Sequence, residues 1–194
     1  MVRKFAFAAF ALAAVSTITP AAAFDGQPRP QQSASTFTNE DIVRSGHEFF
    51  GSTTAGLANV LSHALATFGL PDAYILGEEG GGALIGGVRY GEGALQHPST
   101  YPIPVFWQGP SLGWDFGGSG SRVMMLVYNL PSTDRLMQRF TGVEGSAYLV
   151  GGVSMTVLAA HDTYIVPVRT GLGARLGVNI GYLKFTPEPT WNPF

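Results

Sequence analysis

Glycine is concentrated in a part of the chain whose pattern is otherwise that of β-structure. The block from Gly77 to Arg122 contains the runs GEEGGGALIGGVRYGEGALQ and VFWQGPSLGWDFGGSGSR, in which glycines are interspersed with apolar and charged residues. Glycine weakens a strand locally, but it lets a sheet bend sharply and lets two backbones approach closely. The block therefore predicts strongly curved β-structure, with corners at doubled glycines such as 86–87, 117–118 and 151–152.

Apolar residues follow a period of two from Ala73 onward, which is the pattern of strands with one buried face. The predicted strands lie near 73–78, 82–90, 103–108, 111–117, 121–129, 145–159, 162–169 and 174–185. Many short strands with few helices are typical of small barrels and sandwiches. We expect a mainly β (α+β) fold, either a small antiparallel β-barrel or a highly curved sheet.

A helical region precedes these strands. Thr38 places a capping hydroxyl three residues before Asp41, which predicts a helix start. An apolar stripe at positions i, i+3, i+4, i+7, i+8 and i+11 follows between Leu57 and Phe68. The pattern predicts an N-terminal helical hairpin or bent helix over 39–68, with its stripe covering one opening or one face of the sheet. One further short helix is expected from Pro131 to about Phe140.

The first residues have the pattern of a secretory signal peptide. A basic start is followed by an apolar run of 14 residues and by the small residues of an A-x-A cleavage site. We expect residues 1–23 to be a signal peptide, 24–37 a flexible leader and 38–194 a single domain. Cysteine is absent, so stability must come from the core and no lipid can be attached through cysteine. The expected location is periplasmic, in soluble form after cleavage.

Charge argues against two classes of partner. The formal net charge is −2, and it becomes −4 without residues 1–23, which carry basic residues but no acidic ones. Nucleic-acid binding depends on basic groups that neutralise phosphates, and anionic lipid headgroups attract polybasic segments. Lys184 is the sole lysine beyond residue 23. We expect no nucleic-acid partner.

Proline at three positions between Thr186 and Phe194 breaks the final strand that an integral outer-membrane barrel would need.

Catalytic templates fail at defined positions. A phosphate loop requires lysine and then serine or threonine after its last glycine, but alanine and leucine follow Gly82. A dinucleotide fingerprint that starts at Gly80 meets Ile85 where glycine is required, and a nucleophile elbow meets Ser121 at its last glycine. The four histidines are far apart and form no metal-binding pair. We predict no cofactor, no metal and no catalytic residue.

Charged and aromatic residues nevertheless gather in the glycine-rich block. The adjacent carboxylates Glu78 and Glu79 can perform acid–base chemistry or form ion pairs with Arg89 or Arg122. The aromatic side chains can line a ligand cavity or fill the interior of a small barrel. The candidate binding residues are Glu78, Glu79, Arg89, Tyr90, Glu92, Trp107, Trp114, Asp115 and Arg122.

Four segments closely resemble the family typified by EipA. They are ILGEEGGGALIGGVRYGEG (75–93), VFWQGPSLGWDFGGSGSRVMMLVYNLP (105–131), RFTGVEGSAYLVGG (139–152) and GYLKFTPEPTWNPF (181–194). The similarity runs from about Asp41 to Phe194. It implies a soluble, barrel-like periplasmic protein of alphaproteobacteria that supports cell-envelope integrity, with no assigned activity, cofactor or catalytic residue.

A second, shorter similarity is to the SYLF lipid-binding domain and rests on residues 82–93 and 107–115. It implies an acidic-lipid binder, although the chain lacks the basic surface that such binding needs. The favoured hypothesis is a non-enzymatic protein that binds an envelope component or a protein partner. The alternatives are a carrier of lipid or another hydrophobic ligand, which requires an interior cavity of at least ~300 Å³, and an envelope hydrolase that uses Glu78, Glu79 or Glu92.

Overall fold

A computed structural model describes residues 36–51, 56–82, 87–111, 121–143, 146–170 and 181–192. The predicted signal peptide and most of the predicted leader lie outside these ranges. The elements in chain order are α1 (Asn39–Phe50), α2 (Leu57–Phe68), β1 (Ala73–Gly82), β2 (Gly87–Gln96), β3 (Ile103–Ser111), β4 (Ser121–Tyr128), the 3-10 helix η1 (Thr133–Leu136), β5 (Arg139–Gly142), β6 (Tyr148–Val150), β7 (Val153–Met155), β8 (Leu158–Ala160), β9 (Thr163–Thr170) and β10 (Tyr182–Thr186).

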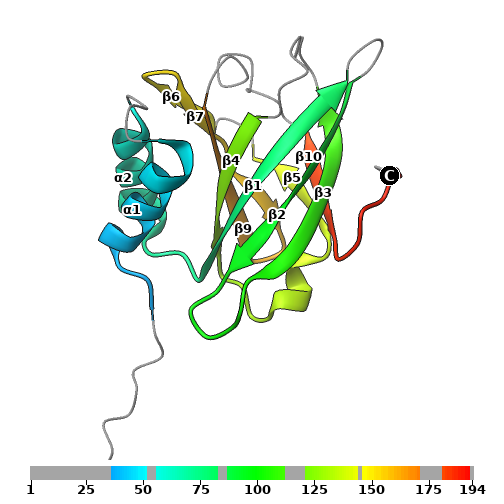
Figure 1. The fold of residues 1–194 in the computed structure, drawn as a ribbon, viewed down its shortest axis with the longest axis horizontal. Coiled ribbons are helices and arrows are strands. Elements are labelled where there is room, and N and C mark those ends of the chain that lie inside the picture. Colours follow the sequence, from blue (N-terminus) through cyan, green and yellow to red (C-terminus); the bar gives the residue numbers. More distant parts are fainter. Residues whose placement is uncertain are drawn as a thin grey trace, which may run out of the picture. The chain divides into compact units, whose positions relative to one another are not determined.

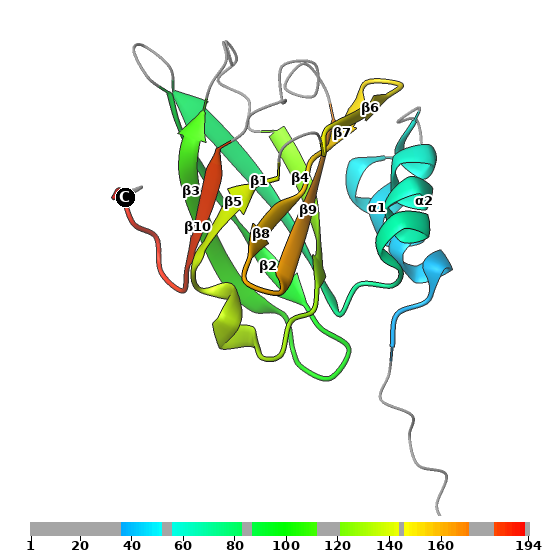
Figure 2. The same ribbon diagram turned by 180° about the vertical axis from the view of Figure 1, so that it is seen from behind.

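Eight strands in the described part of the chain form a closed antiparallel barrel. Their order around the wall is β4-β1-β2-β3-β10-β5-β8-β9, and the pairing of β9 with β4 closes the ring. A hairpin formed by β6 and β7 extends the sheet. Its strand β7 pairs with residues 168–170 of β9, whereas β8 pairs with residues 163–165 of the same strand. Figure 1 shows β1, β2 and β3 in front, and Figure 2 shows β5, β8 and β9 from behind. The predicted antiparallel barrel is confirmed.

The interior of the barrel is filled with apolar side chains. Its largest members are Trp107, Phe140 and Phe185, all completely buried or nearly so. The ring centroids of Trp107 and Phe185 are 6.0 Å apart, and those of Phe140 and Phe185 are 5.7 Å apart in an edge-to-face contact. Aliphatic residues from β1, β2, β4 and β9 complete this cluster. A small barrel of this kind is a packed core rather than a channel.

Two glycines of the glycine-rich block make room for the indole of Trp107. A Cβ atom added at Gly91 would lie 2.2 Å from Cε2 of Trp107, and one added at Gly77 would lie 2.6 Å from its Cη2. Both contacts are far inside van der Waals distance, so the ring lies directly against the backbones of β1 and β2. These glycines serve close packing as well as curvature.

The two helices cover the outer face of β4, β7 and β9. Their buried stripe packs against outward-facing side chains such as Met124, Leu126 and Val168. Both views place the helices on that side of the barrel (Figures 1 and 2). The predicted capping box is present, because Asp41 N donates to Thr38 Oγ1 and the Asp41 carboxylate accepts from Thr38 N. No helix in the described ranges is long and apolar enough to cross a membrane.

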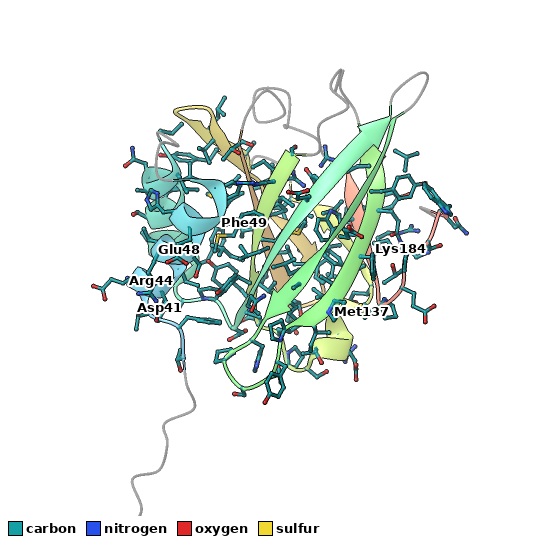
Figure 3. The ribbon with its side chains drawn as sticks, viewed as in Figure 1. Asp41, Arg44, Glu48, Phe49, Met137 and Lys184 are labelled. Atoms are coloured by element: carbon teal, nitrogen blue, oxygen red, sulfur yellow. The ribbon has the colours of Figure 1, made fainter. Side chains whose placement is uncertain are left out.

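Solvent-facing charges of α1 form local ion pairs. Arg44 contacts Asp41, and Arg44 Nε lies 3.9 Å from Glu48 Oε1. These three side chains lie on the side of α1 that is turned away from the barrel (Figure 3). Phe37, the last residue of the predicted leader, contacts the ring of Tyr74 with centroids 4.9 Å apart.

Three predicted elements differ from the structure within the described ranges. Residues 112–117 and 174–180 of two further predicted strands, and the predicted corner at 117–118, lie outside those ranges. The strand expected near 145–159 is divided into β6, β7 and β8. Gly151 and Gly152 have φ angles of 58° and 78° and form the hairpin turn between β6 and β7 rather than a barrel corner. The helix expected to reach Phe140 is the shorter η1, and β5 begins at Arg139. The strand expected at 82–90 is β2, which extends to Gln96 because its pairing with β1 continues to Tyr74.

Candidate binding site

The strands β1, β2 and β3 present different chemistry on their two faces. Glu79, Gly91 and Trp107 are opposite one another in the pairing register and belong to the inner face. The next position along each strand, Glu78, Glu92 and Phe106, belongs to the outer face. Because side chains alternate along a strand, neighbours in sequence such as Glu78 and Glu79 lie on opposite sides of the wall.

On the inner face, Glu79 is the centre of a buried charge cluster. Its Oε1 accepts from Nε of Arg169 at 2.5 Å, and its Oε2 lies 3.3 Å from Nη2 of the same guanidinium. Nε of Arg89 is 3.7 Å from Oε1 of Glu79, and Nε1 of Trp107 is 3.4 Å from Oε2. Two arginines and an indole thus surround one carboxylate.

These partners decide the protonation of Glu79. Burial acts to raise the pKa of its carboxyl group, but the charges of Arg169 and Arg89 and the hydrogen bonds from Arg169 and Trp107 hold the pKa below its ordinary value. Glu79 is therefore ionised at neutral pH. A buried carboxylate held this way is a structural anion, and it does not have the raised pKa of a general acid.

On the outer face, a groove of about 390 Å³ lies between the sheet and the segment that follows β10. We call it the tail groove. Its lining comes from the sheet and from the C-terminal segment. The sheet supplies Glu78, Glu79, Gly80, Tyr90, Gly91, Glu92, Phe106, Trp107 and Gln108, and the C-terminal segment supplies Pro189, Thr190 and Trp191. A neighbouring hollow of about 400 Å³ shares Glu78, Glu92 and Phe106 with it. The concave surface therefore continues along the strands.

The C-terminal segment is fixed in place by Tyr90. The Tyr90 hydroxyl donates to the carbonyl oxygen of Trp191 at 2.9 Å, and the two rings meet edge to face with centroids 5.2 Å apart. The indole of Trp191 is still 85% exposed. This segment lies on the side of the barrel opposite the helices, and Lys184 of β10 is on the same side (Figures 1 and 3). The groove thus has one wall of β-sheet and one wall of anchored tail.

Gln108 lies in this groove with an unmet hydrogen-bonding group. The residue is only 1% exposed, and its Nε2 has no hydrogen-bond partner among the described residues. A buried amide nitrogen without an acceptor costs about 1–3 kcal/mol. Most buried polar groups are paired, so this exception requires an explanation.

Arg122 connects the outer face to the helices. Its Nη1 donates to the carbonyl oxygen of Phe49 at 2.8 Å, and its guanidinium lies 5.8 Å from the centroid of the Phe49 ring. Its Nε is 3.8 Å from Oε1 of Glu78. Figure 3 shows Phe49 on the helical side of the barrel. The expected pairing of the acidic residues with Arg89 and Arg122 is present, but it is divided between the two faces.

The structure therefore separates the residues that the sequence grouped together. Glu79, Arg89 and Trp107 belong to the interior, whereas Glu78, Tyr90, Glu92 and Arg122 belong to the outer surface. Trp114 and Asp115 lie outside the described residues.

Sequence reasoning missed three residues, namely Arg169, Gln108 and Trp191 as a groove residue. Arg169 could have been found from the sequence. It follows the apolar run YIVPV of a buried strand, and a buried arginine needs an anionic partner. Gln108 and Trp191 could not have been found in this way, because their importance depends on the position of the tail.

These features define a class: a small, closed β-barrel with a packed interior, a helical pair on one side and a surface groove on the other. Within that class, the chain belongs to the EipA family, described as envelope integrity protein A, whose family model matches residues 35–194. The match confirms the resemblance found in the sequence. Membership supports a role in the integrity of the cell envelope.

A solved structure agrees with this fold. The crystal structure of a β-barrel-like, uncharacterised protein from Brucella abortus is 60% identical to this chain and superimposes with a TM-score of 0.77. The match covers 82% of this chain and 99% of that one. The description of the relative names a barrel and no activity.

One curated protein is also similar, a glycerol kinase from Thermus brockianus, with 27% identity over 155 residues. The match covers 78% of this chain but only 28% of the kinase. A partial match at this identity does not assign the kinase's activity to this chain. Among the described residues, no three histidine, aspartate or glutamate side chains gather in a way that could hold a metal ion.

Proposed function

We propose that this protein is a non-enzymatic periplasmic protein that supports envelope integrity by binding an envelope component in the tail groove. The observation that carries the proposal is the buried Gln108, which lines the groove and whose amide nitrogen has no acceptor among the described residues. A ligand that fills the groove and accepts from Gln108 would offset that cost. The family description supports the envelope role, and the leader-like pattern of residues 1–23 supports export.

The arrangement of the acidic residues favours binding over catalysis. Glu79 is held as an anion by two arginines and cannot act as a proton donor at neutral pH. Glu78 and Glu92 are cross-strand neighbours on an exposed surface, and Glu78 is paired with Arg122. A hydrolase would need one carboxyl group with a raised pKa in a secluded site. The pKa of Glu79 is lowered instead, and Glu78 and Glu92 are exposed rather than secluded.

The carrier hypothesis has less support. It requires an interior cavity of at least ~300 Å³, but Trp107, Phe140 and Phe185 occupy the middle of the barrel. A cavity beside Arg89 and Arg169 measures only about 20 Å³, which is room for about one water molecule. Within the described residues, the groove outside the barrel is a better place for a ligand than the barrel interior.

The test is genetic. We expect a strain that lacks the gene to be sensitive to detergent and to cell-wall antibiotics, and the intact gene to restore resistance. A gene with Trp191→Ala should not restore it, whereas Tyr101→Ala, at a side chain that is 92% exposed and outside the groove lining, should restore it completely. Full rescue by Trp191→Ala, at equal protein level, would show that the tail groove is not needed for the function.

A further inference from the structure

The residues that line the tail groove determine which chemical groups a ligand must carry. The Nε2 of Gln108 has no acceptor within the part of the chain that the structure describes, so a ligand that satisfies it must offer an oxygen. The residue is 1% exposed and belongs to the lining of the groove. A purely cationic or purely hydrocarbon ligand would leave this donor unmet.

Two carboxylates require that the ligand also carry hydrogen-bond donors. Glu92 has no ion-pair partner among the described residues, and it lies directly across from Glu78 in the β1–β2 register. Glu78 forms an ion pair with Arg122 at 3.8 Å. Carboxylates accept hydrogen bonds, so the ligand must also bring donors. Like charges on directly opposed residues are destabilising, which disfavours any further negative charge beside them.

Aromatic surface supplies the third requirement. Trp191 presents an exposed indole that is held by Tyr90, and Phe106 contributes a half-exposed ring to the floor. Rigid aromatic rings offer apolar contact area at a low cost in conformational entropy. A ligand that suits them has a flat face of C–H groups.

We infer that the tail groove binds a saccharide without acidic groups, presented by an envelope glycan. Sugar hydroxyls both accept and donate, so one ring can accept from Gln108 and donate to Glu92 while its C–H face lies on Trp191. Uronic acids and phosphorylated headgroups are disfavoured by Glu78 and Glu92. This inference deepens the proposed function and rests on it, since it names the ligand class for the same groove.

The experiment measures binding of three soluble trisaccharides to the purified protein by isothermal titration calorimetry and saturation-transfer NMR. The probes are maltotriose, the trimer of N-acetylglucosamine and trigalacturonic acid, which separate a neutral hexose, an N-acetylated hexosamine and an acidic sugar. Gln108→Leu removes the donor with a side chain of similar size, and Trp191→Ala removes the stacking surface. Tyr101→Ala is the matched control for an exposed aromatic residue outside the groove.

We expect one of the two uncharged trisaccharides to bind, and Gln108→Leu and Trp191→Ala each to weaken binding by about tenfold or more. Tyr101→Ala should change the Kd by less than about twofold. The inference is overturned if neither uncharged sugar binds, if trigalacturonic acid binds as tightly, or if Trp191→Ala and a folded Gln108→Leu protein both bind like the original.

The genetic test of the groove separates the two claims. If no uncharged sugar binds but Trp191→Ala still fails to rescue the deletion strain, the ligand class is wrong and the groove function stands. If Trp191→Ala fully rescues the deletion strain, both claims fail: the function of the groove and the assignment of a saccharide as its ligand.

Discussion

The inner and outer faces of β1, β2 and β3 differ in how their polar groups are satisfied. On the inner face, Glu79 is contacted by two arginines and one indole, and every partner is buried or nearly so. On the outer face, Gln108 has an unmet donor and Glu92 has no ion-pair partner among the described residues. The comparison teaches that similar residue types stabilise the fold on the inner face, where they are paired, and that the outer face leaves some of them without a partner in the described ranges.

The largest difference between the faces should appear when each loses an arginine. Arg169→Met leaves the buried Glu79 with the guanidinium of Arg89, 3.7 Å away, as its remaining ion-pair partner in the described ranges, and we expect a loss of about 3 kcal/mol in the free energy of unfolding. Arg122→Met removes the partner of Glu78, which is 64% exposed, and should cost no more than about 1 kcal/mol. Denaturant unfolding measures both. Equal losses would mean that the two faces are not distinct in the way we describe.

Two glycines provide a second contrast. Gly91→Ala places a methyl group about where the Trp107 ring lies, so we expect a loss of about 2 kcal/mol by overpacking. Gly80→Ala is its control, because a Cβ atom there meets nothing within 4 Å. That change should stay within about 0.5 kcal/mol. The near-ultraviolet circular dichroism of Trp107 should change in the Gly91 variant alone.

The pH dependence of stability should sharpen the same contrast. The folded-state pKa of Glu79 is lower than its unfolded value, so its stabilisation is complete above the unfolded pKa of ~4.3 and is lost as pH falls through the folded pKa. The unfolding free energies of the original protein and of Glu79→Gln should therefore differ at pH 7 and converge in acid. Parallel curves from pH 7 to pH 3 would contradict the buried cluster.

The smallest effect is expected on the outer face. Glu92→Gln removes a charge directly opposite Glu78, so the free energy of unfolding should stay the same or rise by no more than about 0.5 kcal/mol. Thermal unfolding at low salt is the suitable measurement, because it exposes weak surface electrostatics. A loss above about 1 kcal/mol would show that Glu92 supports the fold.

Local patterns in the sequence predicted the barrel and the helical pair. Period-two alternation gave most strands, and the Thr38–Asp41 spacing gave the start of α1. The division of 145–159 into three strands could not be predicted in the same way, because it depends on the hairpin at Gly151 and on which part of β9 each piece pairs with.

The sequence correctly predicted that the candidate residues belong to one block of strands. It could not predict which face of the sheet each side chain occupies. Glu78 and Glu79 are neighbours in sequence, and the choice of which one enters the core depends on the register of β1 against β2 and β4. The tail groove has an even longer-range origin. It exists because residues 189–191 lie over strands that are about a hundred positions earlier in the chain.

The place of β10 in the wall has a consequence for when the groove can form. β10 is inserted between β3 and β5, so the barrel has an open seam until residues 182–186 arrive. The segment that walls the groove follows directly behind that strand. A molecule that has been cut before Tyr182 has neither a closed barrel nor the tail wall of the groove. Closure of the barrel and completion of the groove therefore depend on the same short stretch of chain.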